Sequence, residues 1–142
     1  MQVFATLANT ASTHSMVVAT GAAEHAIPVV AKEQGRGSAT SGGEFLCAAL
    51  ATCFCNDLFR EAPAFDIEVI EVSVRVHSEF AGPGDPARHI GYAVEVTATG
   101  DERVIRDLVR HTDAVAEIHN TLRLGLPVLL ESVDVRSVGL HT

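Results

Sequence analysis

The segment 45–59 constrains the fold most, because it is apolar at nearly every position. Ser41, followed three positions later by Glu44, has the form of a capping box, which predicts that a helix begins here. Asn56 and Asp57 are the strongly polar residues within the segment. A helix that is apolar on all sides is buried on all sides, so the rest of the chain must surround it.

Several β-strands are predicted around this helix. The runs 3–8, 15–20 and 26–30 are short and β-like, and the small polar turns between them indicate a meander. The glycine-rich segment 32–43 is expected to be a surface loop. Segment 66–80 alternates apolar and polar residues with one slip in phase between Val69 and Ile70, which predicts a strand with a β-bulge.

The second half of the chain is predicted to add a partner strand, two helical pieces and a last strand. A partner strand that presents Ile90 and Ala98 on one face completes a long antiparallel hairpin. Residues 101–124 are predicted to be helical in two pieces, with Thr112-Asp113 as the second cap, and a last strand is expected over 132–138. The order predicts an α+β fold in a single domain over residues 1–142.

The expected sheets are too small to enclose the helix in one chain. A sheet shields only one side of a helix that is apolar all round, so a second copy of the chain is needed for the other side. We therefore expect an intertwined homodimer, with antiparallel sheets wrapped around the long central helices.

Charge and composition exclude several kinds of partner. The formal net charge of −8 and the pI near 5.2 repel phosphate backbones and anionic lipid, so neither nucleic acid nor a membrane surface is expected to bind. The longest uncharged apolar run, 45–55, is well short of the ~20 residues needed to cross a bilayer. The first basic residue is Lys32, which is unlike a secretory signal, so we expect a cytoplasmic protein.

Cys47, Cys53 and Cys55 all lie in the predicted helix. A zinc site would need a second pair of ligands and a loop, so no metal is expected. On a helix Cys53 and Cys55 point roughly 200° apart, and Cys47 lies about 9 Å of helical rise from Cys53, so no pair is placed to form a disulfide. Two alternatives remain open: one reactive thiol among structural ones, or three buried small apolar residues.

Residues 41–53, SGGEFLCAALATC, resemble the segment of the OsmC/Ohr family that reads S/N-P-x-E-L-L-x-A-A-L-A-x-C. The order of the predicted elements is also similar to that family. The resemblance implies an OsmC-like fold and a dimer with reactive cysteines at its interface. It further implies reduction of organic hydroperoxides by Cys53, without a cofactor.

Two departures from the family pattern change the expected chemistry. Peroxidases of the family carry a second cysteine at the start of the later helix, but nothing after Cys55 is cysteine, so an external thiol would have to reduce the oxidised Cys53. The family glutamate lies ten residues before the reactive cysteine, where this chain has Gly43, and Glu44 lies nine before. The cation that activates Cys53 is expected to be Arg36 or Arg123.

We consider three functions for this sequence. The first is a thiol-dependent peroxidase for organic hydroperoxides, and the second is a non-catalytic dimer that binds an apolar small molecule between its subunits. A hot-dog thioesterase is a third alternative that fits the order of elements poorly. His111 and His119 lie on or beside an apolar helical stripe and could be packing residues or functional ones.

Overall fold

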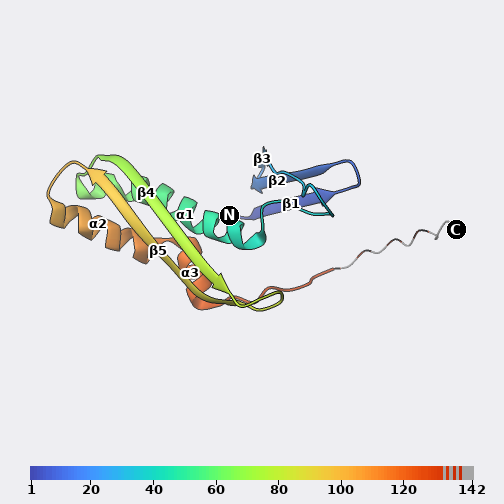
Figure 1. Cartoon of the computed structure of the whole chain (residues 1–142). Coiled ribbons are helices and arrows are strands. Elements are labelled where there is room, and N and C mark those ends of the chain that lie inside the picture. Colours follow the sequence, from blue (N-terminus) through green and yellow to red (C-terminus); the bar gives the residue numbers. More distant parts are fainter. Residues whose placement is uncertain (133, 135, 137, 139–142) are drawn as a thin grey trace.

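The computed structural model describes residues 1–132, 134, 136 and 138. Its elements follow the order β1-β2-β3-α1-η1-β4-β5-α2-α3, with a three-stranded sheet and a separate two-stranded sheet (Figure 1). The strand expected over 132–138 falls largely outside the described residues. In the described part of the chain, no helix combines the length and the apolar character that a bilayer crossing requires.

The meander consists of β1 (Val3–Asn9), β2 (His14–Thr20) and β3 (Ala23–Ile27), all antiparallel. The predicted position of β3 is wrong by about three residues. Thr20 pairs with Ala23, so β2 and β3 are joined by a two-residue turn, and Gly21 adopts φ 57° there. Such a tight turn favours glycine in the left-handed region, which lets β3 begin directly after it.

The central helix, α1, spans Gly42–Glu61 and begins with the predicted capping box. The Ser41 hydroxyl accepts a bond from the Glu44 N–H, and the Glu44 carboxylate accepts one from the Ser41 N–H. Burial of α1 within one chain is one-sided, and the expected cover by a second copy stays a prediction. Leu50, Phe54, Asp57 and Leu58 are buried, whereas Phe59 is 49% exposed, so a single chain covers one side of the helix.

The hairpin consists of β4 (Val69–Phe80) and β5 (Ala87–Ala98), and its register shifts between Val69 and Glu71, as the slip in phase predicts. Val72 pairs with Val96, and Val74 with Val94. These four side chains pack against the core cluster formed by Phe54, Leu58, Ala62, Ile67 and Leu108. The hairpin therefore turns its apolar face inward and its polar face outward.

A short 3-10 helix, η1 (Ala62–Phe65), follows α1, and the last helices are α2 (Glu102–Val115) and α3 (Glu117–Leu124). The break between α2 and α3 lies at Ala116, not at Thr112-Asp113 as predicted. The Thr112 hydroxyl donates to the Leu108 carbonyl one turn earlier. Because that bond is made inside α2, the hydroxyl does not cap a new helix there.

Figure 1 shows the meander set apart from the hairpin and the helices, at the beginning of α1. Helix α1 contacts β4, α2 and α3. This arrangement brings the middle of α1 next to the start of α3.

Candidate functional site

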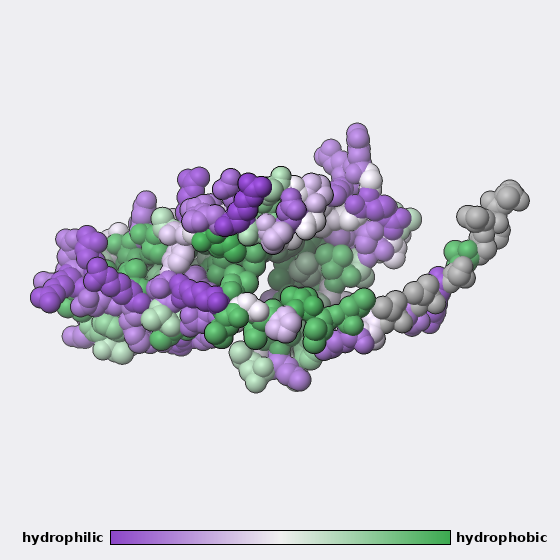
Figure 2. All heavy atoms as spheres, turned by 90° about the horizontal axis from the view of Figure 1, so that it is seen from below, coloured by the Kyte–Doolittle hydropathy of each residue, from purple (hydrophilic) through white to green (hydrophobic). Residues whose placement is uncertain are grey.

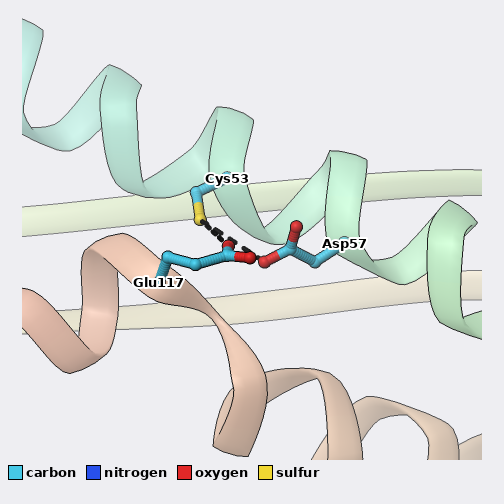
Figure 3. Close-up of side chains that lie close together, drawn as sticks. All are labelled: Cys53, Asp57 and Glu117. Carbon is cyan, nitrogen blue, oxygen red and sulfur yellow. Dashed lines mark hydrogen bonds between the residues drawn. The ribbon is translucent and has the colours of Figure 1, made fainter. Parts of the chain in front are cut away.

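The candidate site is built around the thiol of Cys53, which is half-buried in the middle of α1. Its Sγ lies 3.5 Å from Oδ2 of Asp57, one turn further along the same helix. It also lies 3.7 Å from Oε2 of Glu117, the first residue of α3. Figure 3 shows both carboxylates pointing toward the sulfur, so two helices place acidic groups against one thiol.

Arg60 holds the two carboxylates from their other side. Its Nη1 lies 2.9 Å from Oδ1 of Asp57 and 3.2 Å from Oε1 of Glu117. Its Nε donates to Glu61 at 2.8 Å. The guanidinium thus contacts the oxygens that do not face Cys53, and it acts on the thiol through the carboxylates.

The surroundings disfavour the thiolate in a single chain. Burial raises the pKa of the Cys53 thiol, and the neighbouring Asp57 carboxylate raises it further, against a hydrogen bond with the backbone at Ile118 that lowers it. A thiol with a raised pKa is a poor nucleophile until a base removes its proton.

The two carboxyl groups are not equivalent. Burial raises the pKa of Asp57, and the neighbouring Glu117 raises it further. The pKa of Glu117 is lowered by a hydrogen bond with its own backbone N–H and by Asp57 and Arg60. Asp57 is therefore the stronger base of the pair, and Glu117 is the group that stays ionised.

The same three side chains could also hold a metal ion. One ligand atom each from Cys53, Asp57 and Glu117 lies within 4.8 Å of the other two. A thiolate and two carboxylates, with water as a fourth ligand, would suit a divalent ion such as Zn²⁺. The sequence pattern missed this set, because Glu117 comes from a different helix.

The predicted site residues lie in different places. Within the described residues, the structure does not bring Arg36 or Arg123 to Cys53: Arg36 Nε donates to Oδ1 of Asn9, and Arg123 Nη2 donates to Oδ1 of Asp113 at 2.8 Å. Glu44 has the capping role already described. Contacts of Arg36 or Arg123 with Cys53 of a second subunit remain a prediction.

A separate cavity of about 310 Å³ lies between α3, the start of β5 and α1. It is lined by apolar residues, by Tyr92, Arg88, His89 and Arg123, and by His119, which is only 5% exposed. Neither nitrogen of the His119 ring has a hydrogen-bond partner among the described residues. Burial lowers the pKa of His119, and Arg123 lowers it further, so the imidazole is kept neutral.

His111 has a different environment from His119. Its Nε2 lies 2.7 Å from a Glu61 carboxylate oxygen, and its ring packs on Phe65. Glu61 also binds Arg60, so His111 is connected to the periphery of the thiol site.

Asp57, Arg60 and Glu117 are the site residues that sequence reasoning missed. Asp57 carried a signal, since it is the charged residue of the largely apolar segment 45–59 and lies four positions after Cys53. Such a spacing puts two side chains on one helical face.

The fold and the site together define an α+β protein with a half-buried thiol between two carboxylates at a junction of helices. The chain belongs to the OsmC-like protein family, whose model matches residues 35–131. A search of curated proteins gave no match.

Solved structures support the assignment at the level of the fold. The OsmC-like protein of Mycoplasma pneumoniae is 20% identical, with 86% of each chain covered and a TM-score of 0.62. An organic hydroperoxide resistance protein OsmC from Legionella pneumophila is 21% identical, with 87% of this chain and 90% of that chain covered and a TM-score of 0.55. An organic hydroperoxide resistance protein from Elizabethkingia anophelis is 19% identical, with 88% of this chain and 90% of that chain covered and a TM-score of 0.52.

Proposed function

We propose that this protein is a thiol-dependent peroxidase that reduces organic hydroperoxides through Cys53. The observation that carries the proposal is the contact of the Cys53 Sγ with two carboxylates of unequal basicity, in a chain of the OsmC-like family. Two of the similar structures are described as organic hydroperoxide resistance proteins.

In this mechanism Asp57 is the general base. Its carboxylate takes the thiol proton as the sulfur attacks the terminal oxygen of the hydroperoxide, the S–O bond forms and the O–O bond breaks. The alkoxide leaves and takes the proton back from Asp57, which yields an alcohol and a sulfenic acid on Cys53. Arg60 fixes the position of Asp57 through its 2.9 Å contact with Oδ1.

The sulfenic acid has to be reduced from outside. Glu117 stands at the start of α3, where the family resemblance places a second cysteine, and a carboxylate cannot form a disulfide. An external dithiol would attack the Cys53 sulfur, release water and leave as a disulfide, which restores the thiol. We therefore propose a small-molecule peroxide and a thiol reductant as partners.

We also propose that the protein works as a homodimer. Large apolar residues lie exposed on β1 and after α3, among them Phe4, Leu7, Val128 and Leu130. Figure 2 shows hydrophobic surface gathered in the middle of the face in view, with hydrophilic surface around it. A second copy would cover such a surface and could bring Arg36 or Arg123 to the partner's thiol.

The experiment is a competition between the three cysteines of one chain. The protein is treated with cumene hydroperoxide in the presence of a sulfenate trap, and labelling of Cys47, Cys53 and Cys55 is compared by mass spectrometry. We expect fast labelling of Cys53, with the same labelling rate at Cys53 in Cys47→Ser and Cys55→Ser variants. Equal, slow labelling of all three cysteines would contradict the proposal.

A second candidate function is small-molecule binding without catalysis, and the His119 cavity favours it. A buried neutral imidazole whose two nitrogens find no partner in the part of the chain that the structure describes, set largely among apolar side chains, is suited to a ligand that offers a hydrogen bond and an apolar body. Binding of cumyl alcohol is measured as a rise in the melting temperature of the protein. This rise should be lost in His119→Phe. If Cys53→Ser binds as the unmodified protein does and peroxide is not consumed, this function replaces the first.

A further inference from the structure

Two histidines converge on the outer face of the β4–β5 hairpin, away from the thiol site. His77 on β4 pairs with Gly91 on β5, and His89 lies two residues before Gly91 on the same face. Their ring centroids are 5.1 Å apart, and the ring planes differ by 30°. The two imidazoles therefore lie next to each other, tilted, beside one glycine.

The glycine leaves the space that the imidazoles share. A Cβ added at Gly91 would lie 2.9 Å from Nε2 of His89, 3.0 Å from Cε1 of His77 and 3.2 Å from Nε2 of His77. The Nε2 atom of His89 and the Cε1–Nε2 edge of His77 thus border the same small volume, which any side chain at position 91 would fill. A zinc–nitrogen bond is about 2.0–2.1 Å long, so small rotations of the exposed rings would bring both nitrogens to one ion.

A carboxylate is available on the same face. Glu79 pairs directly with His89 across the two strands and lies two residues from His77 on β4. Side chains opposite one another in an antiparallel pair are within reach, and residues two apart in a strand share a face. Arg75 lies on this face on the other side of His77, so the carboxylate and the guanidinium flank the imidazoles from opposite directions.

We propose that His77 and His89 form a binding site for a divalent transition-metal ion, with Glu79 as an oxygen ligand and water in the remaining positions. Two imidazoles and a carboxylate suit Zn²⁺, Ni²⁺ or Cu²⁺, and they exclude Mg²⁺, which prefers an all-oxygen site. The ladder of β4 and β5 fixes the spacing of the ligands. The site is separate from Cys53 and does not depend on the proposed peroxidase activity.

The test is a titration of the full chain with Zn²⁺, followed by two-dimensional ¹H–¹⁵N spectra of the histidine side chains. This readout identifies each imidazole, so zinc bound by Cys53, Asp57 and Glu117 is not mistaken for the hairpin site. We expect the Nε2 signals of His77 and His89 to shift together and to saturate at one ion, with Mg²⁺ producing no shift. Shifts spread over His25, His77 and His89 alike would overturn the proposal.

Substitutions of the two histidines and of Gly91 test the proposed ligands one at a time. His77→Gln should abolish the zinc-induced shift of His89, and His89→Gln that of His77, while His25→Gln on β3 is the matched control. Gly91→Ala keeps both histidines but places a methyl group where the ion would lie, so we expect its zinc affinity to fall about tenfold or more. Its contacts are with the ends of flexible side chains, so the hairpin should remain folded. Unchanged affinity in Gly91→Ala would contradict the geometry.

Discussion

Replacing Asp57 by Asn separates two effects of one carboxylate on Cys53. A unit charge 3.5 Å from the sulfur changes the energy of a thiolate by about 1 kcal/mol in water and by about 5 kcal/mol at an effective dielectric constant of about 20. Cys53 is only half-buried, so solvent screens the interaction between the carboxylate and the thiolate, and we take its energy as about 1 to 2 kcal/mol. Asp57→Asn should therefore increase the thiolate population about 5- to 30-fold at a pH below the thiol pKa.

The general-base catalysis that the same carboxylate provides should be lost in this variant. General acid–base catalysis is worth about 10²–10⁴ in rate, which exceeds the gain in thiolate. We expect alkylation of Cys53 by iodoacetamide to accelerate while its oxidation by cumene hydroperoxide slows about tenfold or more. Asp57→Glu should recover part of the peroxide rate, and thermal unfolding should confirm that each variant is folded.

The two rates are measured on the same preparations between pH 6 and 9. Glu117→Gln is the matched control, because it removes a charge at 3.7 Å from the sulfur but not the stronger base. It should accelerate both reactions. If Asp57→Asn also accelerates both reactions by the same factor, Asp57 only suppresses the thiolate and the base mechanism is wrong.

Further predictions concern stability. Phe54→Ala should lower the free energy of unfolding by about 3–5 kcal/mol in urea titrations, because Phe54 is fully buried in the core; a loss below 1 kcal/mol would show that the core lies elsewhere. Ser41→Ala should cost about 1 kcal/mol by removing the cap of α1. Burial alone would raise the pKa of Asp113, but hydrogen bonds from Tyr92 and Arg123 produce a net lowering. Its contribution is therefore present above the unfolded pKa and is lost as pH falls below about 4, and Asp113→Asn should flatten this pH dependence.

Local signals in the sequence predict much of the fold. The capping box at Ser41 and Glu44 and the bulge near Ile70 are confirmed, because each depends on residues that are neighbours in the chain. The start of β3 and the break before α3 were predicted wrongly. A two-residue turn at Gly21 decided the first boundary, and the hydrogen bond of the Thr112 hydroxyl inside α2 decided the second. Gly21 and Thr112 could each have served another role.

The candidate site was predicted only in part. Cys53 was identified through a resemblance that covers its own helix, but its partner Glu117 is separated from it by 64 positions. Contacts of that range depend on how α3 packs against α1, and no local pattern encodes them. Arg60, two turns after Cys53 on α1, was not predicted as part of the site, and the roles of Arg36 and Arg123 at a partner's thiol stay predictions.

The most direct test of the account is the second-order rate constant for the reaction of the protein with cumene hydroperoxide. It is measured in single-turnover experiments with dithiothreitol added afterwards to regenerate the thiol. We predict a rate constant well above that of free cysteine at the same pH, and its loss in Cys53→Ser but not in Cys47→Ser. A rate equal to that of free cysteine, or one that survives Cys53→Ser, would contradict the claim that Cys53 is a peroxide-reducing thiol.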